Sequence, residues 1–311
     1  MRTLLLACAL VALPALAQPT NSPVPEGAEV QRVASGFQFV EGPVWKDGAL
    51  LFSDIPGNTV YAYTDADGAT PYLHPSGNSN GLALDAEGRL LLAQHGRRQL
   101  ARLDAPHVQT TLAGRYGDER LNSPNDLAVH SDGSVFFTDP PYGVTPTDPQ
   151  LGFSGVYHLA PDGTVTLLDA ALHRPNGIAL SLDERTLYVT NSETRQLFAS
   201  DLDGDLDTGY ALTRMRELAT LGAPTFAEAE GYTDGLKLDT EGRLYVTSPI
   251  GVSILAPDGT LIDEIAVPEQ TTNCAWGDDD RRTLYVTSGT SLYRIRLNAT
   301  GAPVLGKQNG K

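Results

Sequence analysis

A short pattern recurs six times along this sequence. Each copy begins with an oxygen-bearing side chain and usually a small residue, and continues as an alternating apolar strand, a turn and a second apolar strand. Such a unit cannot bury its apolar face alone, so the copies must pack against one another. We call the residues that begin the copies the opening residues. They are Glu41, Asn80, Asn125, Asn176, Asp234 and Asn273.

The spacing of the opening residues indicates the architecture. They lie 39, 45, 51, 58 and 39 positions apart, a mean period of roughly 46 residues that is typical of propeller blades. Turns such as Lys46–Gly48 and Asp85–Gly88 divide each copy into a hairpin. The returning strands, rich in Leu, Val and Thr, are predicted at 50–53, 90–93, 135–138, 187–190, 244–247 and 284–287.

We therefore predict an all-β fold, a six-bladed β-propeller, because radial repetition of four-stranded sheets protects strand edges around a central channel. The strand-like segment 29–34 precedes the first complete copy and is expected to close the last blade. No linker or charge run divides the chain. The prediction is one propeller domain over 29–311, preceded by a flexible segment at 18–28.

The N-terminus has the pattern of a secretory signal peptide over residues 1–17. Arg2 is followed by an apolar run, 4–13, and a small-residue cleavage site at 15–17. The run is too short to span a membrane, so we expect a periplasmic or secreted protein that is free of the membrane after cleavage. A lipoprotein signal ending at Cys8 is the alternative. Cleavage would leave Cys274 as the only cysteine, without a disulfide partner.

The acidic composition narrows the range of partners. The formal net charge is −16, which repels phosphate backbones and anionic lipids. We therefore expect no nucleic-acid partner. We expect a small-molecule ligand and a monomer or weak dimer.

The opening residues also predict a metal site. In a propeller, equivalent positions of the innermost strands converge on the channel axis, and Ca²⁺ takes roughly six to eight oxygen ligands. Glu41 and Asp234 would supply negative charge, and the asparagines neutral oxygens. The lack of a Cys or His cluster argues against a site built from thiolate or imidazole. We predict a divalent cation in the central channel, Ca²⁺ first, with Zn²⁺, Mn²⁺ or Mg²⁺ as alternatives.

A simpler explanation exists for some opening residues. The Asn-Gly and Asp-Gly pairs at 80, 176 and 234 are common hairpin-turn dipeptides. Glu41-Gly, Asn125-Asp and Asn273-Cys are poorer turn pairs, and a second turn always follows the strand. Six oxygen side chains in one phase therefore favour a site over six turns.

Four phrases resemble a known family. They are Glu41-Gly-Pro-Val-Trp45, Asn122-Ser-Pro-Asn-Asp126, Thr138-Asp-Pro-Pro-Tyr-Gly143 and Arg174-Pro-Asn-Gly177. From about residue 30 to 298 the sequence resembles the gluconolactonase, regucalcin and luciferin-regenerating-enzyme-like family, and its bacterial gluconolactonase branch in particular. The resemblance implies a propeller with a channel cation, often Ca²⁺. By motif position, the implied metal-site residues are Glu41, Asn125, Asn176 and Asp234.

The resemblance further implies hydrolysis of a sugar lactone of the gluconolactone type to the aldonic acid. The cation would stabilise the oxyanion that forms as water attacks. Asp234 is the first candidate for general base, and His95 the second because its ordinary pKa suits proton transfer near neutral pH. Tyr142 is a candidate for stacking on a sugar ring. The candidate substrate contacts are Asn80, His95, Arg120, Asn125, Tyr142 and Asn273.

Two other functions stay open from the sequence. Phosphotriester hydrolysis also occurs on this scaffold with a channel Ca²⁺ held by Glu, Asn and Asp. A non-enzymatic periplasmic sugar-binding propeller with a structural cation would bind its ligand without releasing acid. A panel of lactones and phosphotriesters would separate these three functions.

Overall fold

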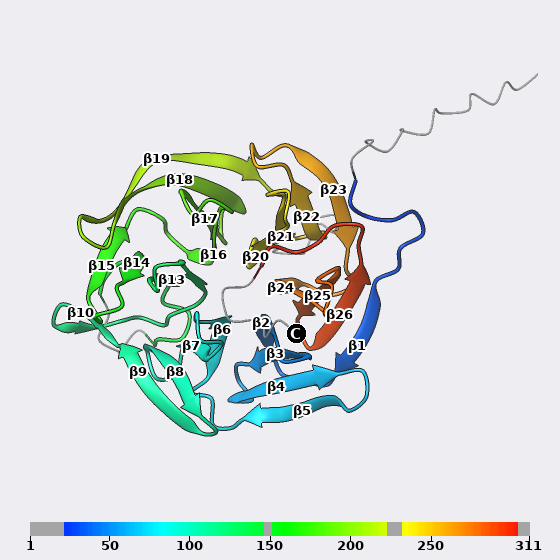
Figure 1. The fold of residues 1–311 in the computed structure, drawn as a ribbon, viewed down its shortest axis with the longest axis horizontal. Coiled ribbons are helices and arrows are strands. Elements are labelled where there is room, and N and C mark those ends of the chain that lie inside the picture. The colour runs from blue at the N-terminus through cyan, green and yellow to red at the C-terminus, as the bar shows by residue number, and fades with distance from the viewer. Residues whose placement is uncertain (1–21, 146–150, 223–231, 304–311) are drawn as a thin grey trace, which may run out of the picture.

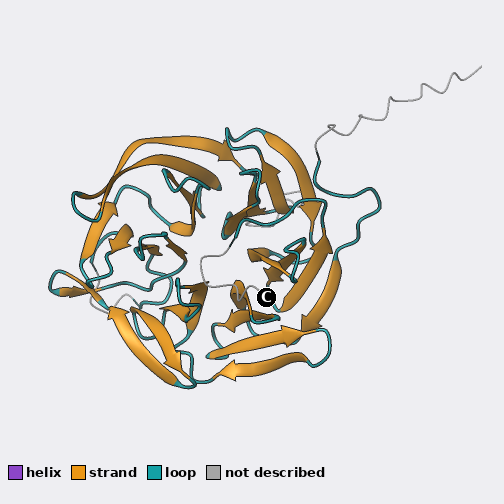
Figure 2. Cartoon of the chain, in the orientation of Figure 1, coloured by secondary structure: helices purple, strands orange, loops and turns teal. Residues whose placement is uncertain are grey.

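The structure is a computed structural model that describes residues 22–145, 151–222 and 232–303. The predicted signal peptide at 1–17 lies outside these ranges. Six four-stranded sheets surround a central axis, and no α-helix occurs in the described residues (Figure 1, Figure 2). Accordingly, no helix there is long and apolar enough to cross a membrane. The predicted six-bladed β-propeller is confirmed.

Each blade runs outward from its innermost strand in chain order. Blade 1 contains β2 (Val40–Lys46), β3 (Ala49–Asp54), β4 (Thr59–Thr64) and β5 (Gly68–Leu73). Blade 2 contains β6 (Ser79–Leu84), β7 (Leu90–Gln94), β8 (Gln99–Ala105) and β9 (Val108–Ala113). A separate two-stranded hairpin, β10 (Arg115–Tyr116) and β11 (Glu119–Arg120), follows blade 2.

The next three blades repeat this order. Blade 3 contains β12 (Leu127–Val129), β13 (Val135–Asp139), β14 (Gly155–Leu159) and β15 (Val165–Asp169). Blade 4 contains β16 (Pro175–Leu180), β17 (Thr186–Asn191), β18 (Gln196–Asp205) and β19 (Gly209–Thr220). Blade 5 contains β20 (Leu236–Leu238), β21 (Leu244–Ser248), β22 (Gly251–Leu255) and β23 (Leu261–Ala266).

The last blade joins the two ends of the chain. Strands β24 (Thr271–Gly277), β25 (Thr283–Ser288) and β26 (Ser291–Arg296) are completed by β1 (Gln31–Ser35), which pairs antiparallel with β26. The prediction that an N-terminal strand closes the last blade is therefore confirmed. Part of the segment that precedes β1 also contacts this blade: the amide of Asn298 donates to the carbonyl of Pro23 (2.8 Å).

The apolar core lies between neighbouring blades. Val44 and Leu51 of blade 1, for example, pack with Leu82 and Leu92 of blade 2 in one buried cluster. The second strands β7, β13, β21 and β25 are buried along their whole length, which explains their Leu, Val and Thr composition. All six returning strands agree with their predicted spans to within one residue at either end.

The glycines that follow opening residues serve close packing at the axis. A Cβ on Gly177 would overlap the carbonyl oxygen of Asp234, and one on Gly42 would overlap that of Asn80. Only glycine allows the inner strands to approach so closely, and Gly42 also has a φ of 56°. Because Asn80-Gly and Asn176-Gly lie inside β6 and β16, the hairpin-turn explanation of these pairs is wrong.

Threonine hydroxyls fix the backbone of several opening residues from the preceding blade. Thr138 Oγ1 donates to the carbonyl of Asn176 (2.6 Å), and Thr190 Oγ1 donates to that of Asp234 (2.7 Å). Thr272 Oγ1 donates to the carbonyl of Val40 (2.7 Å), directly before Glu41. Each of these hydrogen bonds ties the position of one opening residue to the neighbouring blade.

Candidate metal centre and active site

A cavity of about 490 Å³ opens where the innermost strands begin. Its wall combines opening residues with side chains from the loops at the same mouth. Five of the six opening residues line it, so they converge as their common phase predicts. The lining opening residues are Glu41, Asn80, Asn125, Asn176 and Asp234, and the other polar lining residues are His95, Tyr142, Arg174, Ser192, Glu193, Tyr232 and Gln270.

Four buried side-chain oxygens at this mouth accept no hydrogen bond within the described structure. All four belong to opening residues. Leaving one buried acceptor unpaired costs roughly 1–3 kcal/mol, so four at one place indicate a partner that binds them together. A hard divalent cation is such a partner, because it prefers amide and carboxylate oxygens. The four atoms are Asn80 Oδ1, Asn125 Oδ1, Asn176 Oδ1 and Asp234 Oδ1.

Neighbouring side chains orient two of these amides. Asn176 Nδ2 donates to Ser192 Oγ (2.9 Å), and that hydroxyl donates to the carbonyl of Thr233 (2.8 Å). Asn80 Nδ2 lies 2.9 Å from His95 Nε2, an arrangement in which a neutral imidazole accepts the amide proton. With each amide nitrogen bound in this way, Oδ1 is left for the cavity.

The two carboxylates at the centre need a counter-charge. Burial raises the pKa of Glu41, and the nearby Asp126 carboxylate raises it further. Burial also raises the pKa of Asp234, with added repulsion from Glu41 and Asp126. A bound cation would favour the charged forms of both groups. Because no cluster of three Asp, Glu, His or Cys side chains suited to a metal occurs in the described ranges, such a centre depends on the asparagine oxygens.

The sixth opening residue lies deeper in the channel than the other five. Asn273 is 1% exposed and does not line the cavity. Its Nδ2 donates to Glu41 Oε2 (3.1 Å) and to Asp126 Oδ2 (3.3 Å), and its Oδ1 accepts from Lys237 Nζ (3.3 Å). The predicted substrate contact at Asn273 is not supported by this position, because both amide protons are directed at carboxylates. We call Asp126, Lys237 and Asn273 the channel floor.

Lys237 is a member of this floor that the sequence prediction missed. Its Nζ lies 3.9 Å from Asp126 Oδ2 and also donates to the carbonyl of Leu236 (3.0 Å). The repeated pattern does contain a departure that could have identified Lys237. Three residues after the opening residue, the other five copies have Val, Ala, Ala, Ala and Trp, whereas the fifth has lysine.

His95 lines the cavity as predicted, but its environment does not suit a proton acceptor. The ring is buried, and burial lowers its pKa to about 4. It is therefore neutral near pH 7, and its Nε2 is already next to the Asn80 amide. The structure is consistent with His95 as a residue that positions Asn80.

Arg120 is not brought into the cavity. It lies in β11, part of the hairpin between blades 2 and 3, where its side chain is exposed and donates to the carbonyl of Arg97 (2.7 Å). The predicted substrate contact at Arg120 is therefore not supported. An arginine of the cavity is Arg174, which the prediction missed although it belongs to the same phrase as Asn176.

Arg174 forms part of a polar group at the rim of the cavity. Its Nε donates to Glu193 Oε1 (2.9 Å), and its guanidinium carbon lies 5.1 Å from the centre of the Tyr142 ring. Tyr142, predicted as a substrate contact, does line the cavity. We call Tyr142, Arg174 and Glu193 the rim cluster.

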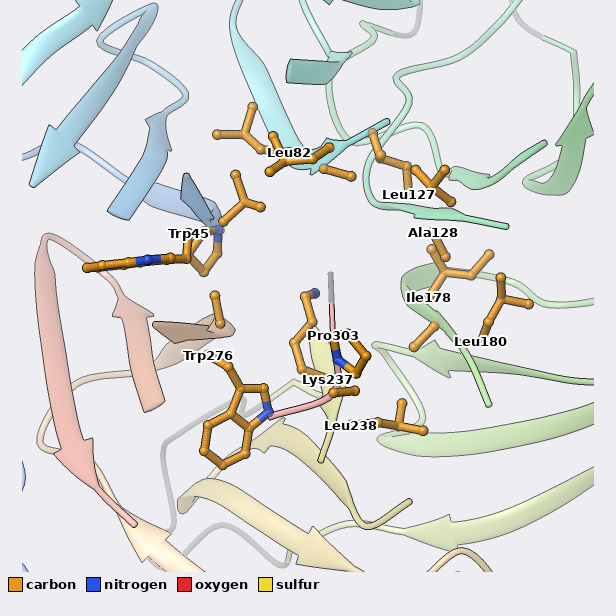
Figure 3. A pocket seen from close by; sticks show the side chains of 18 of the residues that line it. Trp45, Leu82, Leu127, Ala128, Ile178, Leu180, Lys237, Leu238, Trp276 and Pro303 are labelled. Carbon is orange, nitrogen blue, oxygen red and sulfur yellow. The ribbon is translucent and has the colours of Figure 1, made fainter. Parts of the chain in front are cut away.

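The opposite mouth of the channel has a different lining. A cavity of about 280 Å³ there is bounded mainly by apolar side chains, and none of the six opening residues lines it. Figure 3 shows Trp45, Leu82, Leu127, Ile178 and Trp276 around it, with Lys237 of β20 near the centre beside Pro303.

Comparison with known proteins identifies relatives that cover most of the chain. Residues 39–290 match the family model described as the SMP-30/Gluconolactonase/LRE-like region. A gluconolactonase from Zymomonas mobilis is 34% identical over 299 residues, which cover 88% of this chain and 82% of the relative. A pentonolactonase from Haloferax volcanii is 26% identical, with 87% and 95% of the two chains covered.

Solved structures agree with this assignment. A gluconolactonase from Xanthomonas campestris has a TM-score of 0.79 at 34% identity, covering 87% of this chain and 90% of that one. A calcium-binding regucalcin from Agrobacterium tumefaciens, at 22% identity, shares the fold with a TM-score of 0.74 over 90% and 98% of the two chains. Together with the family match over residues 39–290, these relatives show that the chain belongs to the SMP-30/gluconolactonase/LRE-like family.

Proposed function

We propose that this protein is a sugar lactonase that uses a divalent cation to hydrolyse a lactone of the gluconolactone type to its aldonic acid. The relatives named gluconolactonase and pentonolactonase support this reaction class. The observation that carries the proposal is the group of four unpartnered oxygens, one of them from Asp234, beside the buried carboxylate of Glu41. Their cavity, about 490 Å³, falls within the usual size range of small-molecule sites.

The proposed cation-binding residues are Glu41, Asn125, Asn176 and Asp234, and Asn80 Oδ1 faces the same cavity. When bound, a divalent cation polarises the lactone carbonyl and stabilises the negative charge that develops on its oxygen. The all-oxygen set favours Ca²⁺, and Zn²⁺, Mn²⁺ or Mg²⁺ are alternatives. The description of the A. tumefaciens neighbour as calcium-binding agrees with Ca²⁺.

We assign the role of general base to Asp234. Its carboxylate lines the cavity beside the proposed cation, and a carboxylate in that place can accept a proton from the attacking water. Asp234 would accept a proton from the water whose oxygen attacks the carbonyl carbon. As the ring C–O bond breaks, the proton passes to the leaving alkoxide, and the product is the open hydroxy acid.

A pH-indicator assay tests the proposal. Acid release from several sugar lactones is compared with a heat-denatured blank, because lactones also open in water without enzyme. We expect turnover with added Ca²⁺, loss in excess EDTA and recovery when Ca²⁺ is returned. Full activity after exhaustive chelation would exclude the metal role, and binding without acid release would exclude the enzyme. Turnover of phosphotriesters in place of lactones would assign a different reaction.

A further inference from the structure

The rim cluster is attached rigidly to the candidate metal centre. Arg174 precedes Asn176 by two residues, and its backbone amide donates to Asn191 Oδ1 (2.8 Å). The amide of Ser192 donates to the carbonyl of Arg174 (3.0 Å), and the Ser192 hydroxyl accepts from Asn176 Nδ2. The arginine and the asparagine are therefore held in a fixed relation at the end of one blade.

The Arg174 side chain is held at the cavity wall, and its terminal N–H groups remain available as hydrogen-bond donors. Its Nε is bound by Glu193, and its guanidinium lies over one face of Tyr142, a contact that favours a cation. Glu193 is held in turn, because its Oε2 lies 2.8 Å from His173 Nδ1. Among the described residues none accepts a hydrogen bond from Nη1 or Nη2 of Arg174, so these N–H groups, which form a fixed planar fork, are available to a ligand.

The charges at this mouth indicate what that ligand can be. Glu41, Asp234 and Glu193 are carboxylates of the same cavity, and the chain as a whole carries a net charge of −16. Because Arg174 is already paired with Glu193, it offers hydrogen-bond donors without a net positive charge. Such a surface suits neutral hydroxyl groups, whereas a ligand's free carboxylate would lose its hydration there without gaining an unpaired cationic partner.

We propose that Arg174, held by Tyr142 and Glu193, is a specificity-determining residue that binds ring hydroxyls of neutral, polyhydroxylated lactones. The inference rests on the proposed lactonase function. With the lactone carbonyl at the candidate metal centre, the hydroxyl-bearing side of the ring faces the rim cluster. Because the guanidinium covers one face of Tyr142, this ring holds Arg174 in place and offers only its other face to a sugar.

Steady-state kinetics on paired substrates test the role. Glucono-δ-lactone carries the hydroxyls, δ-valerolactone lacks them, and a glucarolactone adds a free carboxylate. The variants are Arg174→Met and Arg174→Lys, with Arg120→Met as the matched control because Arg120 lies outside the cavity. The calcium-dependent shift in melting temperature is measured for each protein to show that Asn176 remains in place.

We expect the wild-type protein to prefer gluconolactone to both other substrates. Arg174→Met should raise KM for gluconolactone about 10-fold, the usual effect of leaving polar groups of a bound ligand unpaired. Its kcat/KM for δ-valerolactone should change by less than about two-fold on the same grounds. Arg174→Lys should lose most of the discrimination because it lacks the planar fork, and Arg120→Met should match the wild type.

Equal losses on gluconolactone and δ-valerolactone would overturn the inference, as would a wild-type protein that does not distinguish them. Failure of the metal-loaded wild type to hydrolyse any lactone would instead overturn the proposed function. If Arg174→Met loses the calcium-dependent shift, the same comparison and the same criteria apply to Tyr142→Leu, which removes the ring beneath the guanidinium.

Discussion

The two mouths of the channel are built by the same six innermost strands but have opposite chemistry. One mouth gathers carboxylates and amides with unpartnered oxygens, and the other gathers Trp, Leu and Ile side chains. Along β16, for example, the lining changes from Asn176 to Ile178 within two residues, a distance of roughly 7 Å along a strand. The blades therefore share the same backbone arrangement. One position in each innermost strand supplies the polar side chains of the candidate site.

The channel floor lies between the two mouths. Its charged side chains, Asp126 and Lys237, interact across this boundary. Asn273 and Asp126 lie on the side of Glu41, whereas Lys237 also lines the apolar cavity. One lysine thus brings positive charge toward two buried carboxylates, those of Asp126 and Glu41, without lining the polar cavity. The comparison predicts that changes at the polar mouth affect catalysis and metal binding, and that changes at the apolar mouth affect stability alone.

The largest effect should come from the polar mouth. Asp234→Asn keeps the side-chain shape but removes the proposed base and one negative charge. We expect kcat/KM for a sugar lactone to fall about 10³-fold, within the range for loss of an acid–base group. Asp183→Asn, in the exposed turn between β16 and β17 and outside the polar cavity, serves as the control. An Asp234→Asn protein with more than a tenth of the normal rate would exclude this role.

A stability measurement should then distinguish a variant at the apolar mouth from one at the polar mouth. Leu82→Ala removes a buried side chain near the apolar cavity and should lower the free energy of unfolding by about 2–5 kcal/mol, with and without Ca²⁺. Asn176→Leu should instead abolish the added stability that Ca²⁺ provides, about 2.7 kcal/mol at 100 times Kd. Urea unfolding at both calcium levels checks both variants. A calcium increment that survives in Asn176→Leu would contradict the proposed centre.

The carboxylates of the polar mouth should also give the chelated protein a distinctive pH dependence. The pKa of Glu41 is raised from 4.5 to about 7 in the folded state, so the folded protein binds this proton more tightly than the unfolded chain. Stability should therefore fall as pH rises from about 4.5 to about 7, by on the order of 2 kcal/mol. Added Ca²⁺ should remove most of this loss.

Glu41→Gln provides the reference for that experiment. His95, whose pKa is lowered by burial to about 4, produces the opposite slope below its ordinary value of 6.5, and it does so in both proteins. The difference between wild type and Glu41→Gln in EDTA therefore isolates the carboxylate. A difference that does not vary between pH 4.5 and 7 would contradict the raised pKa.

The smallest effect should come from the floor. Lys237→Met removes the hydrogen bond to Asn273 Oδ1 and the positive charge near Asp126. We expect a loss of about 1 kcal/mol in EDTA, the usual net value of one hydrogen bond, and a smaller loss with Ca²⁺ bound. Lys46→Met, at the end of the innermost strand of blade 1, is the matched control. Equal stability of Lys237→Met and wild type in EDTA would show that the floor lysine is dispensable.

The fold was predictable because its determinants are local and repeated. Alternating apolar residues and Asp/Gly turns located the second strand of every blade to within one residue at either end. The phase of the opening residues likewise predicted five of the side chains that meet at the polar mouth, since equivalent strand positions face the same axis. The common phase could not predict how each side chain turns at its position.

The roles that the sequence did not predict depend on contacts that the repeated pattern does not specify. Asn273 turns toward Asp126 and Lys237, which are 147 and 36 residues away in the sequence, so its role follows from neighbours that the repeat does not specify. Arg120 was a candidate substrate contact, but the hairpin that carries it directs it to the carbonyl of Arg97. Arg174 and Glu193 become partners only through the geometry of blade 4.

The closure of the last blade has a consequence for the order in which the molecule is made. The hydrogen bonds from Thr272 to Val40 and from Asn273 to Glu41 each join residues 232 positions apart. During synthesis, Glu41 emerges near the start and its supporting amide only near the end. A nascent chain that stops short of blade 6 already contains every proposed cation ligand, yet it lacks the Asn273 amide that binds Glu41. The complete centre therefore forms only after blade 6 has been synthesised and the propeller has closed.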